Sequence, residues 1–142
     1  MINMAGRWNM PDRKTLELAR KDKREGKAPS TQAGEFVREE MEHIREGKHG
    51  ARSTKQAIAI GLSKARRAGV NLPPPEHASP QTRKSAEAAY RAGQQDPGHK
   101  PSKVRSRATT KALKREPHRA ASHDALSNQA HSAARRRRSR QS

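Results

Sequence analysis

Cationic side chains offer the clearest chemistry in this sequence, and they concentrate toward the end of the chain. Four consecutive arginines and a fifth, two residues further on, occupy residues 135–140. Lysine and arginine bind phosphate through charge and hydrogen bonds, so a flexible chain that carries them can neutralise a polyanion without fixed geometry. The candidate nucleic-acid contacts here are Lys100, Lys103, Arg105, Arg107, Lys111, Lys114, Arg115, Arg135, Arg136, Arg137, Arg138 and Arg140.

Histidine clusters are the next candidates, because imidazole binds metal ions. His118, His123 and His131 lie close together in the sequence. Their spacing matches no compact zinc pattern, and neither cysteines nor nearby paired carboxylates complete a ligand shell. We therefore expect solvated histidines, no metal site and no cofactor.

Catalytic motifs are missing from the sequence. It has no nucleophile elbow and no zincin motif, and it has no cysteine, which excludes disulfides and thiol chemistry. The stretch 47–50 (GKHG) lacks the preceding strand and the glycine spacing of a phosphate-binding loop, so it is better interpreted as a helix-to-helix turn. We expect a protein that is not an enzyme.

Composition limits the size of any core. Only 14 of the 142 residues are Val, Ile, Leu or Phe, while 32 Lys and Arg against 14 Asp and Glu give a net charge of +18. This composition is typical of extensively disordered proteins, and the net positive charge indicates a polyanionic partner. No apolar run is long enough to span a membrane and no export signal stands at residues 1–30, so we expect a cytoplasmic protein.

Charge and proline divide the chain into three parts. Prolines 73–75 must stop any preceding helix, and residues 73–142 carry 16 basic and 5 acidic residues. The predicted fold is mainly α: a charged, partly helical arm (1–29), a helical hairpin module (30–72) and a largely disordered basic tail (73–142). Residues 82–92 and 119–138 are alanine-rich enough for nascent helices between the tail prolines.

The segment 53–70 meets the rules for a complete helix. Ser53 and Gln56 form a capping box, and Gly69 followed by Val70 predicts a Schellman ending. Gly61 lies on its small-residue face, which indicates either close approach of another backbone or a tolerated glycine. The basic remainder of the helix adds further candidate nucleic-acid contacts: Lys55, Lys64, Arg66 and Arg67.

Residues 31–46 predict a second amphipathic helix. An apolar stripe (Ala33, Val37, Met41 and Ile44, with Phe36 at its edge) opposes an acidic one (Glu35, Glu39, Glu42 and Glu46). The short connection to residue 53 makes the two helices antiparallel neighbours. So small a module favours dimerisation through its apolar face, or folding on a partner.

The arm and the module share a weak repeat with a period of 21. Arg-Glu-Gly-Lys occurs at 24–27 and at 45–48, each time followed by a new helix start, which indicates recurring cap chemistry. Before the first copy, residues 13–25 predict a charged, fraying helix capped by Asp12, with Glu17 and Lys21 at i, i+4 spacing.

About a third of the chain also resembles a known family. The stretch from Lys21 to Gly69, and KQAIAIGLSKARRAG (55–69) in particular, is similar to small, basic, uncharacterised bacterial proteins classed as a domain of unknown function. Members are sometimes described as DNA-binding or histone-like. The resemblance implies a compact helical module in a bacterial cytosolic protein, and it implies no catalytic residues.

These observations favour a nucleoid-associated, histone-like protein that binds DNA through its phosphate backbone with little sequence preference. The scarcity of aromatic residues argues against stacking-based readout of single strands, although RNA remains an alternative polyanion. Two other hypotheses stay open: a hydrophilic, disordered stress-response protein, and an adaptor whose basic helix docks an acidic protein.

Overall fold

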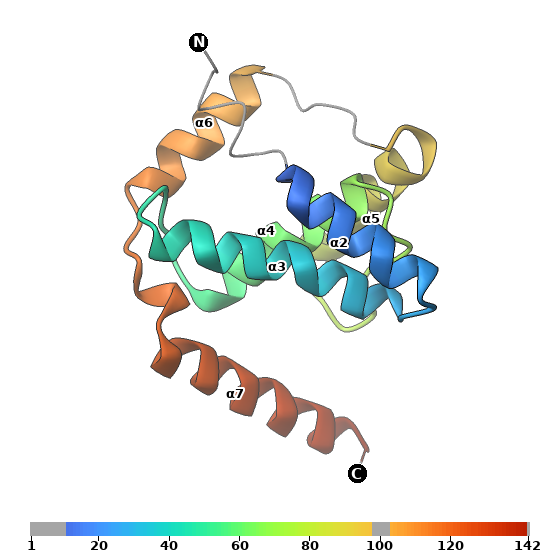
Figure 1. Ribbon diagram of the computed structural model, residues 1–142. Coiled ribbons are helices and arrows are strands. Elements are labelled where there is room, and N and C mark those ends of the chain that lie inside the picture. Colours follow the sequence, from blue (N-terminus) through green and yellow to red (C-terminus); the bar gives the residue numbers. More distant parts are fainter. Residues whose placement is uncertain (1–10, 98–102, 142) are drawn as a thin grey trace.

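The computed structural model describes residues 11–97 and 103–141, and over these residues the protein contains helices and no strand, which confirms the mainly α fold (Figure 1). The helices are α2 (Arg13–Arg24), α3 (Pro29–Arg45), α4 (Thr54–Arg67), α5 (Pro80–Gln95), α6 (Lys103–Lys114), the 3-10 helix η1 (Arg119–Ala121) and α7 (His123–Gln141). Among them α2, α3, α4 and α5 pack in chain order, each against the next.

The start of α4 carries the predicted capping interactions. The Ser53 hydroxyl accepts a hydrogen bond from the backbone N–H of Gln56 at 3.1 Å. The Gln56 side chain in turn accepts from the backbone N–H of Arg52 at 2.6 Å, one residue before the position that the capping box predicts. Two otherwise unpaired donors at the helix start are thus satisfied locally.

Helices α2, α3 and α4 all end in the same Schellman motif. At the end of α4, Gly69 adopts a φ of +100° and donates to the Arg66 carbonyl, while Val70 donates to the Ala65 carbonyl. Gly26 and Gly47 also have positive φ and make the equivalent pair of bonds. The repeat in the sequence therefore marks a recurring helix stop.

The antiparallel hairpin of α3 and α4 is confirmed. Ile44 and Ala57 share one apolar cluster, while Phe36 and Ala65 share another at the opposite end of the pair. Between them, a Cβ built on Gly61 would lie 2.7 Å from the Val37 Cα. Of the two interpretations of Gly61, close approach of another backbone is therefore correct.

The expectation of a disordered tail is wrong for most of the described residues after 79, which form helices; of these, α5, η1 and α7 contact the module. Helix α5 begins with Pro80 as its first residue and lies against α4 through Ala86, Ala89 and Gly93, where a Cβ on Gly93 would overlap the Arg66 carbonyl. The Tyr90 hydroxyl also donates to the Asn71 side chain at 2.5 Å. Small residues thus give α5 a close contact that a count of large apolar residues does not detect.

The segment around η1 closes the other end of the hairpin. The backbone N–H groups of Gly50 and Ala51 donate to the carbonyls of Leu113 (2.8 Å) and Pro117 (3.0 Å). Ala120 and Ala121 are buried in the same cluster as Ile44. The apolar face that we expected to dimerise is therefore covered by other parts of the same chain.

Replacing Gly61 with alanine should destabilise the protein by about 1–3 kcal/mol, because the new methyl group must push α3 and α4 apart. The matched control is Gly34→Ala in α3, where a Cβ meets nothing within 4 Å. This control should be neutral or stabilising by up to about 1 kcal/mol. Urea denaturation followed by circular dichroism measures both, and equal effects of the two substitutions would contradict the close contact.

Candidate functional site

The cations expected to contact nucleic acid fall into an exposed group and a buried group. Lys55 is exposed on α4. The candidate cations of α6 and α7 whose side chains are described are exposed as well: Arg105, Arg107, Lys111, Lys114, Arg135, Arg136, Arg137, Arg138 and Arg140. Arg115, just beyond α6, is also exposed. Lys103 begins α6, and Lys100 lies outside the described residues.

Two predicted contacts, Lys64 and Arg66, are buried and have partners within the protein. Lys64 forms an ion pair with Glu40 of α3. Arg66 donates to the carbonyls of Leu72 (3.0 Å) and Pro73 (3.2 Å), which holds the turn that leads toward α5. The helical-wheel prediction failed here because α4 is packed on two sides, by α3 and by α5.

Two other predicted contacts, distant in the sequence, come together. Arg67 of α4 and Arg105 of α6 line one groove of about 180 Å³. The hydroxyl-bearing residues Ser63, Ser106 and Thr109 line it too. Guanidinium and hydroxyl groups are the donor types that bind phosphate oxygens.

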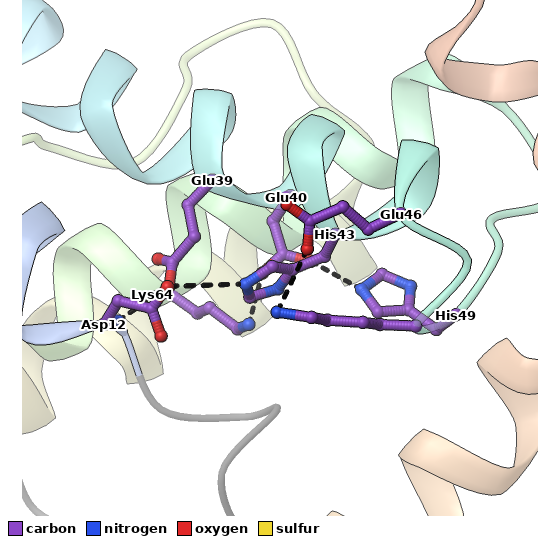
Figure 2. A network of polar contacts seen from close by, with 8 residues as sticks. Asp12, Glu39, Glu40, His43, Glu46, His49 and Lys64 are labelled. Carbon is purple, nitrogen blue, oxygen red and sulfur yellow. Dashed lines mark hydrogen bonds and ion pairs between the residues drawn. The ribbon is translucent and has the colours of Figure 1, made fainter.

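A buried polar cluster between α2, α3 and α4 was not expected from the sequence (Figure 2). At its centre is Glu40, which is 0% exposed and carries Lys64 at one carboxylate oxygen. The other oxygen, Oε2, lies 3.2 Å from His49 Nε2. His49 Nδ1 is 2.8 Å from the Gly50 carbonyl oxygen, which can only accept, so this nitrogen carries the proton.

His43 connects this centre to two further carboxylates. Figure 2 shows Asp12 and Glu39 on one side of His43 and His49 on the other. His43 Nε2 lies 3.6 Å from Asp12 Oδ2 and 3.7 Å from Glu39 Oε1. Glu39 also accepts a 2.7 Å hydrogen bond from the backbone N–H of Asp12, so the start of α2 covers it. We had expected Glu39 on the acidic face opposite the apolar stripe, but it is buried.

Burial and neighbouring charge set the titration of these groups. Burial raises the pKa of Glu39 to about 7, although the bond from Asp12 opposes the shift. Burial would also raise the pKa of Glu40, but the contacts with His49 and Lys64 outweigh it and the pKa lies below its usual value. Burial lowers the pKa of His43, so its imidazole is neutral at pH 7.

The cluster has the donor atoms of a metal site. Glu40, His43 and His49 can each offer one ligand atom, and the three atoms lie within 4.8 Å of one another. Asp12 and Glu39 form a second such group with His43. One feature of the sequence points to this cluster: Glu40 and His43 are three residues apart, which places both on one face of α3. The approach of His49 to them follows only from the fold.

The chain is thus a helical protein with an exposed cationic outer layer and a buried polar cluster. Residues 29–76, about a third of the chain, match the model of a family of unknown function (DUF6496). The match spans α3, α4 and the prolines that follow, so the resemblance to an uncharacterised family is confirmed for the module. Neither a curated protein nor a solved structure matches the chain. Within the described residues, no helix combines the length and apolar character needed to cross a membrane.

Substituting Lys64 by methionine should destabilise the protein by about 3–5 kcal/mol, because it leaves the Glu40 carboxylate buried without its cation. The control, Lys55→Met, changes an exposed lysine of the same helix and should stay within about 0.5 kcal/mol of wild type. Urea denaturation measures both. A Lys64→Met protein as stable as the control would show that the pair is not buried.

Glu39 should make the protein less stable as the pH rises. Between pH 4.5 and about 7 the carboxyl is ionised in the unfolded chain but protonated in the folded one, so the free energy of unfolding falls over this window. Glu39→Gln keeps the acceptor for Asp12 and removes the titration. The variant should therefore match wild type near pH 4 and exceed its stability by about 2–3 kcal/mol at pH 8.

Thermal unfolding in chelator-containing buffers from pH 4 to 8 measures this difference. Glu42→Gln is the matched control, because Glu42 is exposed on the same helix. It should show no pH-dependent gain. A difference between wild type and Glu39→Gln that does not change with pH would contradict the raised pKa.

Proposed function

We propose that this protein is a non-enzymatic, nucleoid-associated DNA-binding protein that contacts the phosphate backbone with little sequence preference. The observation that carries the proposal is the distribution of charge at the end of the chain. Residues 103–141 contain 12 Lys and Arg and two acidic residues, Glu116 and Asp124. Apart from Lys103, whose side chain is not described, every one of these cations is exposed.

The helical state of this region makes the proposal more specific. On α6, Arg107, Lys111 and Lys114 follow at i, i+4 and i+7, which aligns them along one face. On α7, the five arginines occupy the last two turns, beyond the residues near η1 that pack on the module (Figure 1). Exposed cations, aligned on α6 and clustered at the end of α7, suit a duplex, whose phosphates are regularly spaced.

The groove that contains Arg67 and Arg105 supplies a second, more structured contact. It lies between α4 and α6 and offers hydroxyl groups beside the two guanidinium groups. A phosphate bound there would fix the register of the module on the duplex, while the arginines of α7 would add affinity.

The adaptor hypothesis is the weaker alternative. Of the four basic residues on α4, Lys64 and Arg66 are buried, which leaves Lys55 exposed and Arg67 half-buried. The stress-protein hypothesis required extensive disorder, whereas residues 80–95 and 103–141 are almost entirely helical.

Full-length protein should bind a short mixed-sequence DNA duplex with steep salt dependence, measured by fluorescence anisotropy between about 50 and 200 mM salt. Changing Arg135, Arg136, Arg137 and Arg138 to glutamine should reduce the slope of log affinity against log salt by about 3–4, since each phosphate contact contributes about 0.9. Scrambling the duplex sequence should change the affinity little.

The matched control removes the same charge elsewhere, by changing Lys14, Arg20, Lys21 and Lys23 of α2 to glutamine; all four are exposed. If net charge alone governs binding, both quadruple variants lose affinity equally and the role of α7 is refuted. Weak binding of the wild-type chain at physiological salt would refute the DNA proposal itself. Tighter binding to a matched RNA duplex would instead identify RNA as the partner.

A further inference from the structure

We propose that Glu40, His43 and His49 form a binding site for one divalent transition-metal ion, with Zn²⁺ as the fitting example. The three residues supply one carboxylate oxygen and two imidazole nitrogens, which is a ligand set that zinc uses when it keeps a fourth position for water or another ligand. The site is separate from the cationic surface and does not depend on DNA binding.

The two histidines are oriented as metal ligands. In metal sites, the imidazole nitrogen that does not bind the ion donates its proton to a carbonyl or a carboxylate. His49 Nδ1 donates to the Gly50 carbonyl, which leaves Nε2 facing Glu40. His43 Nε2 faces the carboxylates of Asp12 and Glu39, which leaves Nδ1 for the ion.

Buried ligand atoms without hydrogen-bond partners are the second observation that points to an ion. His43 is 5% exposed, yet its Nδ1 has no hydrogen-bond partner among the described residues. Glu40 Oε2 also has none among them, and it lies 3.2 Å from His49 Nε2. Unsatisfied buried polar atoms are costly, and a shared cation would satisfy both.

The spacing of these atoms suits a tetrahedral zinc ion. Two ligand atoms that each lie 2.0–2.1 Å from a tetrahedral ion are about 3.3 Å apart, and Glu40 Oε2 and His49 Nε2 are separated by 3.2 Å. One ligand atom from each of the three residues lies within 4.8 Å of the other two, which is about 1.5 Å more than the separation expected around the ion.

The surrounding charges also fit a divalent ion. Three carboxyl groups, those of Asp12, Glu39 and Glu40, lie around the two histidines, against the single ammonium group of Lys64. A divalent cation would therefore enter a site with more acidic than basic groups. Lys64 does not block the site, because it contacts Oε1 of Glu40 and leaves Oε2 to the ion.

The test uses the full-length chain, stripped with a chelator and titrated with Zn²⁺ against a competing chromophoric chelator. The decisive variant changes His77, His99, His118, His123 and His131 to glutamine, so that His43 and His49 are the only histidines left. It should bind one equivalent of Zn²⁺ as tightly as wild type. X-ray absorption of its zinc complex should show two imidazole ligands, and Zn²⁺ should raise its melting temperature.

The complementary variant is His49→Gln, which removes one ligand. It should weaken Zn²⁺ binding by more than about 100-fold and abolish the thermal stabilisation. Circular dichroism checks that this variant is folded. If it is not, the five-histidine variant decides alone, because it leaves the cluster intact.

Two results would overturn the proposal. One is a five-histidine variant that binds less than one equivalent of Zn²⁺, or whose complex shows fewer than two imidazoles. The other is a folded His49→Gln protein that binds Zn²⁺ as tightly as wild type, which would assign the zinc to the other histidines.

Discussion

Close contact between helix backbones is the constraint on which the rest of this structure depends. Only 14 of the 142 residues are Val, Ile, Leu or Phe. The chain therefore has too few bulky side chains to fill a wide space between its helices. Instead Gly61 lets α4 approach Val37 of α3, and Gly93 lets α5 approach the Arg66 carbonyl. Many dispersion contacts between backbone and small side chains then replace the contacts that large apolar side chains make in other cores.

Close packing also explains why so many polar groups are buried. When helices approach through small residues, the long side chains beside the contact are enclosed as well, and each must find a partner. Lys64 finds Glu40, and Arg66 finds two backbone carbonyls. Removing one member of such a pair costs more than the pair contributes, so these residues make the packing of α3, α4 and the following turn specific.

Charge is divided between the inside and the outside of the molecule. The interior holds the carboxyl groups of Glu39 and Glu40, two imidazoles and one ammonium group, with the exposed Asp12 at its edge, a composition suited to a single metal ion. The exterior of α6 and α7 holds the excess cations, which suits a large polyanion. The two arrangements are chemically independent, although both depend on the module that residues 29–76 form.

By itself the sequence determined the features that depend on neighbouring residues: the Ser53 cap, the three glycine stops and the amphipathic pattern that pairs α3 with α4. These follow from backbone geometry and hydrogen bonds within a turn or two. Only the tertiary structure decided that Lys64 and Arg66 are buried, that His49 joins Glu40 and His43, and that α5 packs against α4. Each of these outcomes needs a contact between distant segments, and alanine, glycine and backbone carbonyls make such contacts without leaving a recognisable pattern in the sequence.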